Sequence, residues 1–308
     1  MSSINDLMQA DLLEGQLPAG VDSLAAALQS EFGDSLQAVL MYGSCRRKAD
    51  ASEGLVDLLV IVDNYRTAFK SRLWAMMNWL LPPNVFYLEA RTEESVIRCK
   101  YAVITLAQFQ RRCRARSDHY FWARFSQPMR LVWQRQDIAP ALAQARASAA
   151  LAFSARIAPL LAAGVSAEGF WQRCLAATYR CELRPEPPGN AARLIANDPA
   201  YWEQITLAIA EHSDVLAVGD SGYVAGPGGF SPLAMRISWQ LRRLGGKLFN
   251  LARLFKAAGT FSNGIDYIVW KVERHSGVRI EPTERMRRYP RLAAWGLVWR
   301  LWRQGGFR

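Results

Sequence analysis

The stretch from Gln37 to Asp63 constrains the fold of this chain more than any other part of its sequence. It reads QAVLMYGSCRRKADASEGLVDLLVIVD: an apolar run ending at Tyr42, a Gly43-Ser44 turn, a polar and basic spacer, and a second apolar run. Apolar runs of this length around a glycine-containing turn are typical of neighbouring strands. The stretch therefore predicts two adjacent strands of one sheet.

The same stretch carries residues suited to binding phosphate. Because Gly43 adds no Cβ, backbone N–H groups and the Ser44 hydroxyl can approach phosphate oxygens at this turn. Asp57 stands at the start of the second apolar run, where its carboxylate can hold Mg²⁺ against the same phosphates. The alternative interpretation is a strand, a tight turn and a strand with an incidental aspartate, since Gly-Ser is a common turn dipeptide.

This layout resembles the nucleotidyltransferase superfamily, in which a second carboxylate usually follows the first by two residues. Here that position is Leu59. Asp63 shares the face of Asp57, but six residues of strand span roughly 20 Å, so we expect Asp63 only to end the strand. We predict that Glu89, at the end of the next apolar run, completes the metal site. A solvent-facing strand end is the alternative for Glu89.

Further motifs follow in a particular order: YGSCR (42–46), VDLLVIVDNYRTAF (56–69), VFYLE (85–89), KYAVITLAQF (100–109) and YFWARFSQPMRLVW (120–133). This order resembles the mitochondrial-type phosphatidate cytidylyltransferases, the translocator assembly and maintenance family, and is most similar to its bacterial branch. The stretch 246–274 resembles the closing basic helical region of that family. The resemblance covers roughly residues 38–275. It implies a Mg²⁺-dependent enzyme that transfers a cytidylyl group from CTP to phosphatidic acid at a membrane surface.

The resemblance also implies roles for individual residues. Around Arg124 the chain departs from the family's Gly-Arg-x-x-Lys-Pro segment, because Ala123 and Gln127 replace the glycine and the lysine; Asn263 stands where a lysine is expected. The implied roles are catalytic for Asp57, Lys100 and Lys271, nucleotide-binding for Tyr42, Gly43, Ser44, Arg46, Tyr101 and Arg124, and metal-binding for Asp57.

The chemistry of such a reaction agrees with the lack of a catalytic histidine motif. The three histidines (His119, His212 and His275) have neither metal-ligand nor triad spacing. A phosphate monoester has its second pKa near 6, so it is mostly dianionic at neutral pH and needs no general base as a nucleophile. It needs neutralisation of charge, which metal ions, lysine and arginine provide. We therefore expect a mechanism based on metal and cations.

Charge is distributed unevenly along the chain. From Arg236 to the end there are 16 Lys+Arg against 4 Asp+Glu, a net charge of +12, whereas the first 235 residues hold 22 against 23, a net of −1. A basic region of this kind suits an anionic membrane surface or nucleic acid, and a solvated face is the plain alternative. Because the aromatic residues at the end of the chain gather on one helix face instead of alternating with arginine, we expect no nucleic acid partner.

The segment from Arg291 to Gln304 predicts an amphipathic helix. Trp295, Trp299 and Trp302 share its apolar arc, with Arg300 and Arg303 on the adjoining polar side. A helix of this length is only ~21 Å long, too short to span a bilayer and suited to lying in its interface. The alternative is that this face docks on the rest of the protein as ordinary core.

The overall class predicted is α/β. We expect a nucleotidyltransferase-like catalytic domain with a mixed sheet (1–135), a mostly helical domain with a basic C-terminal part (136–281), and an amphipathic membrane-binding tail (282–308). No apolar stretch is long enough to span a bilayer, the N-terminus lacks the features of a signal peptide, and the five cysteines contain no CxxC pair. These features predict a cytoplasmic protein, peripheral on the inner face of the cell membrane.

Three hypotheses of function follow. The favoured one is a CTP:phosphatidate cytidylyltransferase that makes CDP-diacylglycerol and pyrophosphate. The second is a nucleotidyltransferase of the same fold that acts on RNA or another soluble acceptor. The third is a catalytically weakened relative that serves as a membrane-bound scaffold, which the absence of a carboxylate at Leu59 keeps open.

Overall fold

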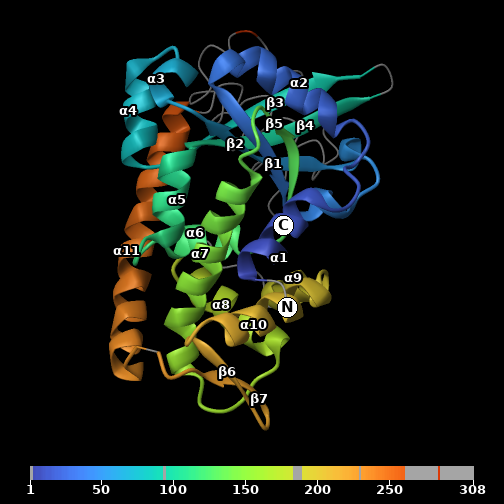
Figure 1. Cartoon of the computed structure of the whole chain (residues 1–308). Coiled ribbons are helices and arrows are strands. Elements are labelled where there is room, and N and C mark those ends of the chain that lie inside the picture. Colours follow the sequence, from blue (N-terminus) through green and yellow to red (C-terminus); the bar gives the residue numbers. More distant parts are fainter. Residues whose placement is uncertain (1–2, 93–94, 183–188, 229, 261–283, 285–308) are drawn as a thin grey trace, which may run out of the picture.

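A five-stranded mixed sheet forms the centre of the upper part of the molecule in the computed structural model (Figure 1). The model describes residues 3–92, 95–182, 189–228, 230–260 and 284. The strand order is β3-β4-β2-β1-β5; β2 and β4 run parallel and the other neighbours run antiparallel. The two strands expected around the Gly-Ser turn are therefore neighbours, as predicted. The strands are β1 (Leu36–Tyr42), β2 (Leu55–Val62), β3 (Asn84–Arg91), β4 (Val96–Thr105) and β5 (Met129–Gln134).

Helices cover both faces of this sheet. Side chains alternate along a strand, so Leu40 and Leu59 enter one hydrophobic cluster whereas Val39 and Leu58 enter another. Residues of α2 (Val21–Phe32), α3 (Tyr65–Ala68) and α4 (Arg72–Leu80) pack into the second cluster. Residues of α1 (Ile4–Leu13), α5 (Leu106–Arg114), α6 (His119–Phe125) and α7 (Ala139–Ile157) pack into the first.

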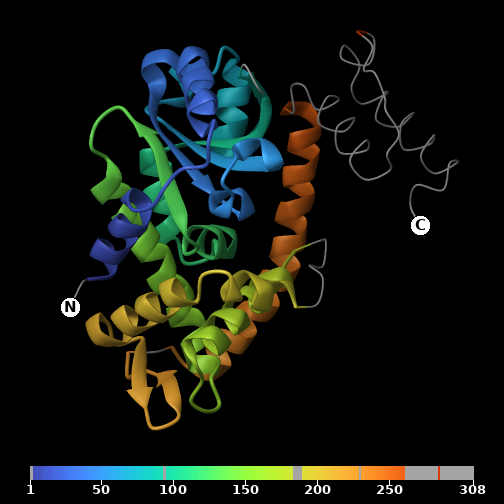
Figure 2. The same ribbon diagram turned by 90° about the vertical axis from the view of Figure 1, so that its right-hand side faces the viewer.

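The chain after β5 is mostly helical, as predicted. It continues from α7 through α8 (Ala167–Tyr179), α9 (Asn190–Ala196), α10 (Pro199–His212), the hairpin β6 (Leu216–Gly219) and β7 (Gly222–Ala225), and α11 (Pro232–Thr260). The long helix α11 runs along one side of the molecule (Figures 1 and 2). No helix within the described residues is both long and apolar enough to cross a membrane.

One hydrophobic cluster crosses the domain boundary expected at residue 135. It contains Leu40 of the sheet, Phe121 of α6, Phe153 of α7 and Trp171 of α8, each fully buried. The expected boundary does fall between β5 and α7, but the sheet and the helices that follow it share a core. The boundary expected at residue 282 and the amphipathic tail lie outside the described residues.

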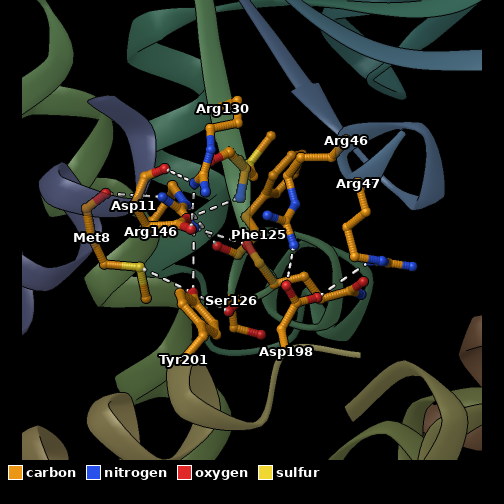
Figure 3. Close-up of polar contacts among 12 residues, drawn as sticks. Met8, Asp11, Arg46, Arg47, Phe125, Ser126, Arg130, Arg146, Asp198 and Tyr201 are labelled. Carbon is orange, nitrogen blue, oxygen red and sulfur yellow. Dashed lines mark hydrogen bonds and ion pairs between the residues drawn. The ribbon is translucent and has the colours of Figure 1, made fainter. Parts of the chain in front are cut away.

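A buried arginine on α7 connects these two parts (Figure 3). The Arg146 side chain is 0% exposed, and its Nη2 atom donates to Asp11 Oδ2 (2.6 Å) and to the Gln127 carbonyl (2.8 Å). Its Nη1 atom donates to the Met8 carbonyl at 3.0 Å, and the Tyr201 hydroxyl lies 3.3 Å from Nη2. Burial acts to lower the pKa of Arg146, but the Asp11 carboxylate outweighs it, so the pKa is raised and the guanidinium stays charged.

We predict that Asp11→Asn destabilises the protein by about 3–5 kcal/mol, because it leaves the buried Arg146 charge without a carboxylate. Asp34→Asn is the matched control: Asp34 also pairs with an arginine, Arg135 at 3.1 Å, but its side chain is fully exposed, so no loss of stability is expected. Urea unfolding followed by circular dichroism measures both. Equal unfolding midpoints for the two variants would contradict the role given to Asp11.

Candidate active site

Three neighbouring strands place polar side chains side by side on one face of the sheet. Asp57 on β2 is in register with Tyr42 on β1 and with Lys100 on β4. The Lys100 Nζ atom lies 2.9 Å from Asp57 Oδ1, and the two side chains remain 39% and 19% exposed. Asp57 Oδ1 is buried and has no hydrogen bond of good geometry, so its contact with Lys100 is an ion pair only.

The Gly-Ser turn comes very close to this carboxylate. Gly43 has a φ of +79°, and a Cβ built on it would lie 2.9 Å from Asp57 Oδ2. A side chain at this position would meet both backbone strain and a steric clash, so the turn requires glycine. Ser44 follows with an exposed side chain and begins a short 3₁₀ turn (Ser44–Arg47). The turn and the aspartate, predicted to cooperate, are thus adjacent in space.

Arg124 on α6 adds a cation beside the turn. Its guanidinium lies 5.2 Å from the centroid of the Tyr42 ring and 5.4 Å from that of Tyr120. Burial acts to lower the pKa of Arg124, but the phenols of Tyr120 and Tyr42 and the carboxylate of Asp57 outweigh it, so the pKa is raised. Arg124 therefore supplies a permanent positive charge close to Asp57.

A cleft of ≈ 330 Å³ opens beside the Gly-Ser turn. Arg46 and Arg47 point from the turn toward Asp198, which precedes α10 (Figure 3). Arg46 forms a largely buried ion pair with Asp198, and Arg47 Nη1 lies 3.3 Å from the second oxygen of the same carboxylate. The residues that line the cleft are Gly43, Ser44, Arg46, Arg47, Gln127, Pro128, Asn190, Arg193, Leu194, Asn197 and Asp198.

The charge of the cleft suits an anion. Three arginines (Arg46, Arg47 and Arg193) line it against one carboxylate, Asp198. Guanidinium groups form strong, charge-assisted hydrogen bonds with phosphate. Arg193 and Asp198 were missed in the sequence, where they stand about 150 residues from the turn and carry no motif of their own. Only the folded arrangement brings them to Arg46.

Tyr101, expected to bind the nucleotide beside Lys100, faces the other side of the sheet. Consecutive residues of a strand point to opposite faces, so Lys100 and Tyr101 cannot line the same site. The Tyr101 side chain is 3% exposed, stacks on Phe86 and donates its hydroxyl to Glu31 at 2.9 Å. Its position therefore corrects the expectation: Tyr101 belongs to the packing of α2 on the sheet.

Glu89, expected as a second metal ligand, does not come close to Asp57. It lies on β3, with β4 between it and β2, and is in register with Arg98, which in turn is in register with Leu55. Two strand spacings alone amount to about 10 Å. Glu89 instead pairs with Arg98 at 3.1 Å and accepts a hydrogen bond from Tyr87 at 2.7 Å. Asp63 is exposed directly after β2, as expected for a residue that ends the strand.

Some predicted residues lie outside the described part of the chain. These are Lys271 and the membrane-binding set Trp295, Trp299, Arg300, Trp302 and Arg303.

The donor set around Asp57 fits one kind of Mg²⁺ site only. No group of three or more His, Cys, Asp and Glu side chains that could hold a metal occurs among the described residues. Leu59, at the position of the missing second carboxylate, is 1% exposed in the core. Mg²⁺ commonly binds one carboxylate together with water and the phosphates of a substrate. Asp57 is suited to that arrangement.

No protein-family model matches the chain, and no curated protein matches it. Among solved structures it is similar to a nucleotidyltransferase-like protein from Exiguobacterium sibiricum, with 12% sequence identity over 93% of this chain and 92% of that one, at a TM-score of 0.25. A likeness this weak carries no argument about activity. The resemblance to the phosphatidate cytidylyltransferases stays a prediction.

We predict that Gly43→Ala lowers the affinity for inorganic tripolyphosphate with Mg²⁺ at least tenfold, because its Cβ displaces either the turn or Asp57. Gly33→Ala is the matched control: its φ is also positive, at +53°, but a Cβ there meets nothing within 4 Å. Both variants carry backbone strain of about 1–3 kcal/mol, so both lose stability. Calorimetric titration separates them, and an equal loss of affinity would show that strain alone is responsible.

Proposed function

We propose that this chain is a nucleotidyltransferase whose acceptor carries a phosphate group. The observation that carries the proposal is the close approach of the Gly43-Ser44 turn to Asp57 and Lys100, beside a cleft lined by arginines. The glycine lets backbone N–H groups approach phosphate oxygens, the carboxylate can hold a metal ion, and the fixed cations neutralise charge. Together these groups are suited to binding a triphosphate next to a second phosphate.

The proposed reaction is an in-line displacement. An oxygen of the acceptor phosphate attacks the α-phosphorus of the nucleoside triphosphate and forms a new P–O bond. The bond from the α-phosphorus to the oxygen that bridges it to the β-phosphate breaks, and pyrophosphate leaves with that electron pair. The acceptor is mostly dianionic at neutral pH, so no proton has to be removed. The barrier then arises mainly from bringing two anions together.

Different residues of the site bind the triphosphate, hold the metal ion and stabilise the leaving group. Backbone N–H groups at Gly43 and Ser44 and the Ser44 hydroxyl hold the triphosphate. Asp57 would hold Mg²⁺, which neutralises phosphate charge when bound. Lys100, released from Asp57, and Arg124 stabilise negative charge that moves toward the leaving group. Each of these groups acts by charge and position.

The arginine cleft suits the acceptor. Arg46, Arg47 and Arg193 lie on the side of the turn that opens into the cleft. An acceptor phosphate bound there would approach a triphosphate held at the turn. It would also compete with Asp198 for Arg46 and Arg47.

Within this class we propose CTP as the donor and phosphatidic acid as the acceptor, giving CDP-diacylglycerol and pyrophosphate. The ordered motifs from Tyr42 to Trp133 support this choice. The basic last quarter of the chain supports a place on an anionic membrane surface, which for a cytoplasmic protein is the inner face of the cell membrane. A soluble acceptor such as RNA, and a weakened scaffold that binds without turnover, are the alternatives that the assay must separate.

The decisive assay supplies purified protein with α-labelled CTP, Mg²⁺ and phosphatidic acid in detergent. We expect label in CDP-diacylglycerol, release of pyrophosphate, and loss of both on chelation of the metal. Label transferred to RNA and never to phosphatidic acid would favour the soluble acceptor. Binding of CTP without any transfer would favour the scaffold.

We predict that Asp57→Asn lowers kcat/KM by a factor of about 10²–10³, since the amide keeps the shape of the side chain but removes the charge that binds Mg²⁺. Asp63→Asn is the matched control and should stay within twofold of the wild type, because Asp63 is exposed beyond the end of β2. Glu89→Gln should also stay close to the wild type, given its pairing with Arg98. Near-normal turnover of a folded Asp57→Asn variant would show that the site is misplaced.

A further inference from the structure

The four positions that surround Asp57 on its face of the sheet contain no second carboxylate. Tyr42 on β1 and Lys100 on β4 lie beside Asp57 in register. On β2 itself the same face carries Leu55 and Leu59, two residues before and after the aspartate. A second Mg²⁺ beside Asp57 would need a further oxygen ligand, for which Mg²⁺ in proteins normally uses a carboxylate. These positions of the sheet therefore provide a carboxylate for one metal ion only.

The two oxygens of the Asp57 carboxylate have different neighbours. Oδ1 is buried and lies 2.9 Å from Lys100 Nζ. Oδ2 faces the Gly-Ser turn, since a Cβ built on Gly43 would lie 2.9 Å from it. A carboxylate that bridges two metal ions, about 3.5–4 Å apart, holds one ion at each oxygen. Here the Lys100 ammonium stands beside Oδ1, so only Oδ2 is placed to hold a metal ion next to a triphosphate at the turn.

The positive charge of Lys100 both opposes and replaces that of a second metal ion. Like charges a few ångströms apart repel each other most where water is partly excluded, and the Asp57 side chain is only 19% exposed. Arg124, whose guanidinium stays charged near Asp57, adds to this repulsion. The same ammonium is also a fixed cation that can neutralise phosphate charge without a second metal.

The kind of acceptor decides whether one metal ion is enough. A hydroxyl group has to lose a proton when it attacks phosphorus, and a general base or a second metal ion normally assists that loss. The sheet positions around Asp57 provide neither a histidine nor a second carboxylate for it. A phosphate monoester is mostly dianionic at neutral pH and attacks without losing a proton. For such an acceptor the second cation has only to neutralise charge, which a lysine can do.

We propose that the site uses a single Mg²⁺, held by Asp57 through Oδ2, and that Lys100 acts in place of a second metal ion. This inference rests on the proposed function and narrows it to acceptors that arrive already ionised. A phosphate group meets that requirement, whereas a hydroxyl group, such as that at the 3′ end of RNA, does not. The parallel register of β2 with β4 is what brings the lysine to the carboxylate.

Electron paramagnetic resonance can count the metal ions, with Mn²⁺ in place of Mg²⁺. The full chain is saturated with α,β-methylene-CTP, which cannot transfer its nucleotidyl group. We expect one Mn²⁺ per chain, with the spectrum of an isolated ion. Two Mn²⁺ per chain with coupled spins would overturn the inference and leave the proposed function standing. A chain that does not bind the analogue would overturn the proposed function, and this inference with it.

Lys100→Gln tests the role of the lysine. In the absence of nucleotide, Mn²⁺ should bind this variant at least threefold more tightly than the wild type, because a repelling charge beside Asp57 is removed. Turnover of CTP with phosphatidic acid should nevertheless fall about 10²-fold. Arg98→Gln is the matched control: Arg98 lies two residues earlier on the same face of β4 but pairs with Glu89 at 3.1 Å, so both quantities should stay within twofold of the wild type. A Lys100→Gln variant that loses metal affinity and turnover together, or that keeps its turnover, would overturn the role given to Lys100.

Discussion

The ion pair between Asp11 and Arg146 is the contact on which the arrangement of the whole molecule depends. Arg146 also holds the Gln127 carbonyl, and Gln127 and Pro128 line the cleft. The Tyr201 hydroxyl, 3.3 Å from the same guanidinium, donates to the Ser126 carbonyl at 2.6 Å. One buried charge therefore fixes the first helix, one wall of the cleft and the start of α10 against each other. Because such a charge is costly to leave unpaired, the position of the cleft is set by the core rather than by the loops around it.

Local patterns in the sequence were enough to predict that the Gly43-Ser44 turn lies next to Asp57. Two apolar runs around Gly43 predicted neighbouring strands, and the register of β1 with β2 then places Asp57 beside the turn. Glycine is required at that turn because the backbone comes close to the Asp57 carboxylate. The sequence shows the glycine but not the close approach. Lys100 joins Asp57 because β2 and β4 are parallel and in register. All of these follow from the period of two along a strand.

What the sequence did not predict depends on which elements become neighbours. Tyr101 follows Lys100 in the sequence, but the alternation of side chains along β4 turns it to the other face of the sheet. The prediction that Glu89 binds the metal with Asp57 is wrong for another reason. The distance between the two residues depends on the strand order, in which β4 lies between β3 and β2. Asp198 reaches Arg46 only through the docking of α10. No spacing rule links residues 152 positions apart, and only the packing of the helical part against the sheet decides that contact.

The contacts of α1 have a consequence for the order in which the chain folds during synthesis. The Met8 carbonyl accepts a hydrogen bond from Arg146, which lies 138 residues later in the chain. The Tyr201 hydroxyl donates to the Met8 sulfur across 193 residues. About half of the polypeptide must therefore be synthesised before the first helix can dock on Arg146, and about two-thirds before Tyr201 can reach Met8. Until then the sheet has formed with one apolar face uncovered, which is the kind of exposed surface that chaperones bind and that slows folding. A protein with its first and middle segments so interlocked completes its core late.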